Sequence, residues 1–329
     1  MSRFPFRDFF FEEVKKTPGM VNCHAHLDRA YTVTPGNWKQ ASALMEEKWV
    51  LNRDIKRQHT EETLIKRLKY CIDGFIDQGI IACRTHVDAD FIVDMLVVDS
   101  AVKVRDEYKD RFELQLVPQP LEGLLTKESR DLYEKACDKC DVVGGLPSSD
   151  RKEQGGDRKH MEFLISTAKN LGKDIDVHVD QENNPEEHDS EWILDMIEKE
   201  GMQGRVTFVH ALSVSAQLGE DRNRIYKKMV DTGTNVTVCP WAVIGMKQHK
   251  DKVAPLHNSI AQVDEMIEAG VNVSVGTDNI SDIFVPEDRG DLFEEIILMA
   301  CACRYYDVAG LAKIATTNGA KTLKLKNYG

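Results

Sequence analysis

Eight short apolar segments recur along this chain of 329 residues, and longer amphipathic stretches separate them. Each segment is rich in Val, Ile or Leu and has the length of a parallel strand that is buried on both faces. The segments are residues 19–23, 80–84, 113–117, 141–145, 175–179, 206–209, 235–239 and 271–275. Residues 61–78 and 259–269 have helical spacing, and a glycine follows each stretch as a stop signal. This alternation predicts an α/β fold, the (β/α)8 barrel of the TIM type.

The charge balance limits the partners that the chain can bind. It holds 43 basic and 55 acidic residues, so no surplus of positive charge is present to meet phosphate groups. We therefore expect no nucleic-acid partner. We expect no membrane partner either, because no apolar run approaches the ~18 residues that span a bilayer. Eight cysteines in so large a chain are typical of free thiols, which favours a cytoplasmic location.

The first residues differ from the rest of the chain. Residues 1–18 form an aromatic N-terminal extension, which is too short and too charged for a secretory signal. Residues 19–329 contain every predicted strand and are expected to form one barrel domain. The aromatic side chains of the extension could cover the bottom of the barrel or contact a second subunit, so we expect a homo-oligomer.

Polar side chains follow the predicted strands at the point where each strand ends. They are His24, His26 and Asp28, His86 and Asp88, Gln119, then His178, Asp180 and Gln181, His210, and finally Asp278, Asn279 and Asp282. A single buried histidine is usually a packed core residue. A set at the same end of successive strands indicates a functional site, because active sites of such barrels lie at the carboxyl ends of the strands.

Four of these residues are suitable metal ligands. His24 and His26 alternate along one strand, so their side chains point to the same face. Together with His178 and Asp278 they offer three imidazoles and one carboxylate, a donor set that suits one zinc or iron ion. An ion with an open position lowers the pKa of bound water towards ~7, and Asp278 is placed to accept the proton. The fourth segment ends Val143-Gly144-Gly145-Leu146-Pro147, without an acid or a lysine that could bridge a second ion, which favours a single metal.

The chain resembles the amidohydrolase superfamily, and within it the cytosine deaminase-like branch. The resemblance covers roughly residues 19–320. The matching motifs, in order, are Asn22-Cys23-His24-Ala25-His26-Leu27-Asp28, Arg84-Thr85-His86-Val87-Asp88, Val117-Pro118-Gln119, Asp141-Val142-Val143-Gly144-Gly145, Asp176-Val177-His178-Val179-Asp180 and Gly276-Thr277-Asp278. The two-histidine motif alone is a modest signal, whereas the whole series in this order is specific.

The resemblance implies roles by position. The four proposed ligands match the metal ligands of the family, and Asp278 also matches its proton-handling base. His210 matches a histidine that orients the attacking water or the leaving group. Gln119 matches a glutamine that recognises the amide edge of a pyrimidine, although a turn-stabilising amide is an alternative. We also expect His86, Asn279 and Asp282 to contact the substrate.

Two features depart from the family. Cytosine deaminases carry a glutamate three residues after the fifth-strand histidine, where it shuttles a proton, and this chain has Gln181 there. A neutral amide cannot act as acid or base, so a substrate that needs no ring protonation is favoured. The neighbouring Glu182 would point elsewhere. Family members also carry an accessory β-sandwich, which we expect to be absent or truncated here.

These features predict a metal-dependent hydrolase of a non-peptide C–N bond. The substrate would be a small cyclic or N-substituted amide or amidine, cut by a deaminase or an amidohydrolase. The alternative, supported by Gln181, is a protein that retains the metal but has lost catalysis and acts in binding or assembly. A structural zinc site would need a cysteine-rich cage, which is lacking. The basic segment 246–252 could meet an anionic substrate group, although a solvated loop is the simpler interpretation.

Overall fold

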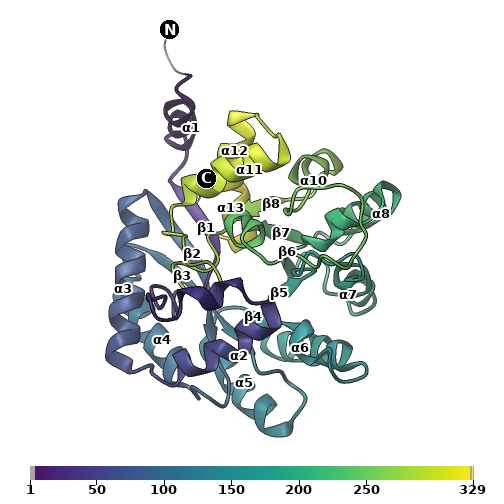
Figure 1. The fold of residues 1–329 in the computed structure, drawn as a ribbon. Helices are drawn as coiled ribbons and strands as arrows, with labels where there is room; N and C mark the ends of the chain where they lie inside the picture. Colours follow the sequence, from purple (N-terminus) through teal and green to yellow (C-terminus); the bar gives the residue numbers. More distant parts are fainter. Residues whose placement is uncertain (1–3, 327, 329) are drawn as a thin grey trace.

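A computed structural model of the chain describes residues 4–326 and 328, and it contains the predicted barrel (Figure 1). Residues 1–3 of the extension, and residues 327 and 329, lie outside the described part. The strands are β1 Met20–Ala25, β2 Ile80–Asp88, β3 Glu113–Gln119, β4 Val143–Gly145, β5 Ile175–Val179, β6 Val206–His210, β7 Asn235–Val238 and β8 Val273–Val275. All pairings are parallel and follow chain order, β1 to β3 in one sheet and β4 to β8 in another.

Short backbone contacts join the two sheets into a closed barrel. The amide of Asp141 donates to the carbonyl of Leu116 at 2.8 Å, which links β3 to the segment leading into β4. At the other seam, the amide of Asp278 donates to the carbonyl of His24 at 2.9 Å, and the amide of His26 donates to that of Asp278 at 3.1 Å. The second seam therefore brings the predicted ligands of the first and last strands together.

Several strands run further than the sequence pattern predicts. β1, β2, β3 and β6 each include polar residues at the carboxyl end, where the apolar pattern had already stopped. The reason is that backbone pairing with the neighbouring strands continues past the apolar residues into the barrel mouth. Among the described residues, these eight strands are the only ones.

Helices surround the barrel and complete its connections. They are α1 Phe6–Val14, α2 Met45–Lys56, α3 Glu61–Asp77, α4 Leu96–Tyr108, α5 Lys127–Lys139, α6 Gly156–Leu171, α7 Asp189–Lys199, α8 Gly219–Asp231, α9 Pro240–Ile244, α10 Val263–Ala269, α11 Leu292–Cys303, α12 Val308–Ala315 and α13 Thr317–Leu323, with short 3-10 turns at Trp38–Ser42, Pro147–Asp150 and Ser213–Ala216. The side chain of Thr60 caps α3 by accepting a hydrogen bond from the backbone amide of Thr63.

One helix begins later than the sequence predicts. Helical spacing starts at residue 259, whereas α10 begins at Val263, because residues 258–263 form tight turns.

The aromatic extension contributes α1, which packs against α12 and the start of α11 (Figure 1). Phe10 is fully buried, and its ring lies 5.1 Å from that of Phe293. Phe4 and Phe9 are exposed. Among the helices of the described residues, none combines the length and the apolar character needed to cross a bilayer. All eight cysteines are free thiols, as predicted.

The long connection after β1 places α2 over the mouth of the barrel. Ion pairs fix its carboxyl end, because the ammonium of Lys56 lies 3.1 Å from Asp88 and 2.5 Å from Asp90. Arg53 pairs with Glu122 at 2.6 Å. The amino-terminal half of α2 is thereby held as a wall above the strand ends.

Candidate active site

The two histidines of β1 lie side by side at the bottom of the mouth. His24 is fully buried and His26 nearly so, and their rings stand at right angles. The segment after β8 approaches β1 closely. A Cβ atom on Gly276 would lie 2.6 Å from the carbonyl oxygen of His24, so the glycine before Thr277 and Asp278 is required by space. Glycine here lets the last strand deliver its carboxylate to the histidines.

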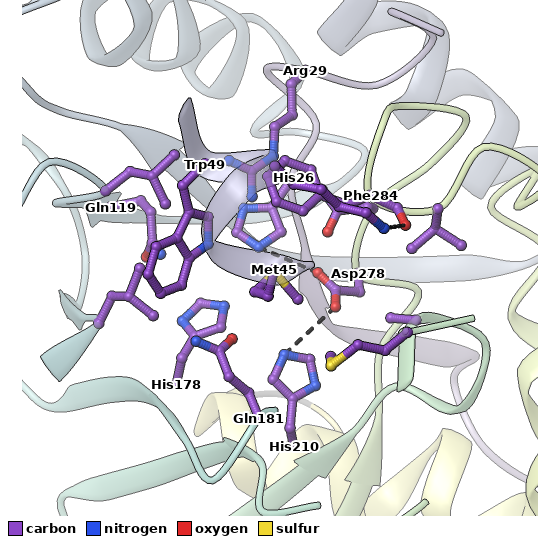
Figure 2. A pocket seen from close by; sticks show the side chains of 17 residues that line it. His26, Arg29, Met45, Trp49, Gln119, His178, Gln181, His210, Asp278 and Phe284 are labelled. Carbon is purple, nitrogen blue, oxygen red and sulfur yellow. Dashed lines mark hydrogen bonds and ion pairs between the residues drawn. The ribbon is translucent and has the colours of Figure 1, made fainter. Parts of the chain in front are cut away.

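Asp278 is the centre of the histidine cluster. Its Oδ1 lies 3.4 Å from Nε2 of His24 and 3.2 Å from Nε2 of His26. Its Oδ2 lies 3.5 Å from Nε2 of His210, and Figure 2 shows Asp278 between His26 and His210. Asp278 and His210 both adopt left-handed backbone conformations, with φ of 60° and 74°. Such conformations are costly outside glycine and gather at functional sites.

His178 completes the set from β5. Its Nδ1 lies 3.2 Å from the carbonyl of Gly145, which accepts a hydrogen bond and leaves Nε2 available to an ion. One ligand atom from each of His24, His26 and His178 lies within 4.8 Å of the others, and the same holds for His24, His210 and Asp278. The structure therefore brings all four predicted ligands together.

The cluster leaves polar atoms without partners although they are buried. These atoms are Nδ1 and Nε2 of His24, Nδ1 of His26, Nδ1 of His210 and Oδ1 of Asp278. Leaving such groups unpaired in the interior is costly, and a divalent cation would take one ligand atom from each of these side chains. The donor set thus fits the metal that the sequence predicts.

Protonation states also suit metal binding. Burial lowers the pKa of His26 and of His178 well below the ordinary value, and it lowers that of His210 to about 4. Burial alone would raise the pKa of Asp278, but the close approach of the His24 and His26 imidazoles holds it well below its usual range. Neutral imidazoles and an ionised carboxylate are the forms that coordinate a cation.

His86 lies beside this cluster at the end of β2, where the sequence places it, and its partners there come from the protein. It does not line the pocket. Both ring nitrogens are engaged inside the protein, Nδ1 by the side-chain oxygen Oε1 of Gln119 at 2.7 Å and Nε2 by Oδ1 of Asp176 at 2.9 Å. Arg84 also binds Asp176, at 2.7 Å. His86 can therefore position Gln119, which does line the pocket, but it has no free atom for a substrate.

Asp282 is likewise occupied by the protein. Its Oδ1 accepts from the amides of Phe284 and Val285, and its Oδ2 accepts from the side chain of Asn279 at 2.6 Å. These contacts shape the loop after β8. Asn279 lines the pocket, so the substrate contact predicted for both residues is open to Asn279 alone.

Gln181 lines the same pocket near His178 (Figure 2). Its Nε2 donates to the hydroxyl of Ser148 at 3.1 Å, which leaves Oε1 as an acceptor. Glu182 does not line this pocket, and its carboxylate lies 3.6 Å from Arg151. Among the described residues, no acid of the loop 182–187 therefore lines the pocket beside Gln181.

Sequence reasoning missed the wall that α2 provides. Met45, Lys48 and Trp49 of α2 line the pocket, together with Arg29 and Phe284 from other segments. Figure 2 shows Met45, Trp49, Arg29 and Phe284 around the histidines. The available signal was the connection between the first strand and the helix at 61–78, which is long enough to hold an element of its own. The apolar and aromatic side chains of this wall suit a small planar molecule.

Known proteins resemble this chain in sequence and in structure. The sequence pattern of the amidohydrolase family matches residues 150–329. An uncharacterized protein of Haemophilus influenzae is 34% identical over 263 residues, which are 80% of this chain and 95% of that protein. The chain belongs to the amidohydrolase family. The predicted resemblance is confirmed.

Two further relatives of this amidohydrolase have stated activities. The N-isopropylammelide isopropyl amidohydrolase of Pseudomonas sp. strain ADP is 25% identical over 331 residues, covering 95% of this chain and 76% of that one. The crystal structure of 5-methylcytosine deaminase from Klebsiella pneumoniae with 5-fluorocytosine matches with a TM-score of 0.88 and 26% identity, over 95% of this chain and 76% of that one. The predicted barrel and the predicted class, a hydrolase of non-peptide C–N bonds, are confirmed.

Proposed function

We propose that this amidohydrolase binds one zinc or iron ion through His24, His26, His178 and Asp278 and removes an amine from a small planar ring. The observation that carries the proposal is the set of buried, unpartnered donor atoms that faces a pocket with aromatic walls. When bound, the ion would supply a Lewis acid that makes water nucleophilic near neutral pH. The other steps belong to side chains of the chain.

Asp278 carries the proton in this proposal. Its low pKa keeps it ionised, so it can accept a proton from the attacking water and pass it to the leaving amine. The C–N bond then breaks, and the ring carbon keeps the oxygen. His210, whose pKa of about 4 keeps the ring neutral, lies 3.5 Å from Asp278 and can orient the water or the amine.

Gln119 and Gln181 would form hydrogen bonds with polar atoms at the edge of the substrate ring. The side-chain oxygen of Gln181 is free to accept a hydrogen bond, but the neutral amide cannot give up a proton as an acid would. Gln181 therefore fits a substrate whose ring nitrogen already carries hydrogen, such as a lactam. Gln119 would contact the neighbouring amide edge while His86 holds it in place. This arrangement favours lactam rings that carry a substituted amine, such as N-isopropylammelide, over cytosine. The cytoplasmic location and homo-oligomeric state stay predictions.

Amine or ammonia release tests the proposal. Metal-loaded protein would be offered N-isopropylammelide, pterin and 5-methylcytosine, chosen because relatives are named for such substrates. We expect release from a lactam-type ring and little from cytosine. Release from none of these rings would favour the alternative, a metal-retaining binding protein without catalysis.

A further inference from the structure

Two lysines of α2 are buried, and they differ in their partners. Lys56 is 2% exposed, and carboxylates of Asp88 and Asp90 neutralise it. Lys48 is 3% exposed and has no carboxylate oxygen within 4.0 Å among residues 4–326 and 328. Its ammonium donates to the carbonyl of Phe284 at 3.1 Å.

Lys48 therefore has unused binding capacity. An ammonium carries three donors, and a buried cation without a counter-charge is costly. Burial lowers the pKa of Lys48. The charges of Asp282 and Glu287 raise it, but by less than burial lowers it. The oxygens of Asp282 are taken by backbone amides and by Asn279, as described above.

The position of Lys48 indicates that an anionic partner would reach it from the pocket. Lys48 lines the same pocket as His26, His178 and Asp278. The other buried cation there, Arg29, already lies 3.5 Å from Asp88 and 3.6 Å from Asp282. An incoming molecule that fills this pocket would meet Lys48 as the cation without a counter-charge.

We propose that Lys48 binds an anionic oxygen on the substrate, and that the substrate is a planar ring bearing an ionised imide or a carboxylate on the edge that faces α2. Trp49 and Phe284 line the same pocket and supply apolar surfaces for the ring. This inference rests on the proposed function and adds charge to the description of the substrate.

The basic segment 246–252 is a weaker candidate for the same task. Lys247 is exposed and does not line this pocket. Lys252 is paired with Glu186 at 2.6 Å. The anion contact that the sequence allowed for this loop is thus better assigned to Lys48.

Two ring compounds that are not substrates can show whether binding depends on the charge of the ring or on its shape. Barbiturate and uracil are pyrimidine rings of similar size, and at neutral pH the first is ionised and the second is neutral. Calorimetry on the metal-loaded enzyme should show barbiturate binding at least ~10-fold more tightly, as expected for a hydrogen bond to a charged group. Equal affinities for the two rings would overturn the proposal.

Substitutions can show which residue causes barbiturate to bind more tightly than uracil. Lys48→Met keeps the length of the side chain and should remove the preference, whereas Lys48→Arg should retain most of it. Lys247→Met makes the same change in net charge near the mouth and should leave the preference intact. A preference that persists in Lys48→Met would come from the metal and would overturn the proposal. The melting temperature of each variant shows that it is folded.

Binding also keeps this test separate from the proposed function. If Lys48 governs the preference but no ring is hydrolysed, the proposed reaction fails and the subsite stands. If a ring is hydrolysed but the two probes bind alike, the reaction stands and the role of Lys48 fails.

Discussion

Two polar clusters lie against each other inside this barrel and differ in how their atoms are satisfied. The rings of His24 and His86 are 4.7 Å apart, yet only His86 has a partner on both nitrogens. The cluster around His86 uses Asp176 and Arg84 as internal counter-charges. The cluster around His24 and Asp278 leaves buried donor atoms without partners. The difference teaches that burial and residue type do not separate these two clusters, whereas the hydrogen-bond partners of their ring nitrogens do.

The largest effect is expected from Asp278→Asn, in the unsatisfied cluster. An amide can still offer an oxygen to the ion but cannot accept a proton, so kcat should fall by about 10³–10⁴-fold while part of the metal is retained. Steady-state kinetics on the best ring from the amine-release panel would measure it. Turnover near the wild-type rate would show that another residue is the base.

Asp176→Asn probes the satisfied cluster and should cost stability. Removing one member of a buried ion pair typically costs ~3–5 kcal/mol, and denaturant unfolding would measure the loss. The exposed pair Lys127–Asp131 provides the control, since Asp131→Asn should cost no more than about 1 kcal/mol. We expect the Asp176 variant to keep its metal. Complete loss of metal from folded protein would make Asp176 a ligand.

The loss of stability in Asp176→Asn should depend on pH. Burial opposes ionisation of Asp176, but the hydrogen bond from His86 and the charge of Arg84 lower its pKa to about 2. Because this value lies below the ordinary one, the stabilisation is complete above the unfolded pKa and is lost as the pH falls through the folded pKa. The stability gap between wild type and Asp176→Asn should therefore narrow below pH ~4. A gap that does not change with pH would contradict an ionised Asp176.

The sequence predicted the barrel, and it selected four side chains that the structure brings together, because strand patterns and the polar residues at their ends are visible locally. His24 and His26 alternate within one strand, and the eight apolar segments repeat with a regular character. The roles of His86 and Lys48 could not be predicted in this way. His86 is occupied by Asp176, which comes from a different strand, and Lys48 is distinguished from Lys56 only by the carboxylates it lacks. Whether a buried group has a partner is a property of the packed structure.

A smaller effect is expected from Gln119→Leu, which joins the two clusters through its contact with His86. Loss of one substrate hydrogen bond should raise KM about 10-fold and change kcat less. His86 should also lose its amide partner, so the melting temperature is measured in parallel. A fall in kcat with unchanged KM would instead place Gln119 in the chemical step.

The smallest effect is expected from Gln181→Glu with cytosine as substrate. A well-placed acid contributes ~10²–10⁴-fold, but this pocket offers Gln181 as an acceptor held by Ser148, so we expect cytosine deamination to stay near zero. Ammonia release would measure it. A hundredfold rise would show a site shaped for cytosine that lacks only a proton donor.

Metal content tests the central claim most directly. Elemental analysis of the purified wild-type chain, grown with zinc and iron available, should give one ion of zinc or iron per chain, and His178→Ala should lose most of it. His188, which is exposed and outside the cluster, provides the control, and His188→Ala should keep the full amount. Absence of metal from the wild type, or a full complement in His178→Ala, would contradict the claim that the unsatisfied cluster is the metal site.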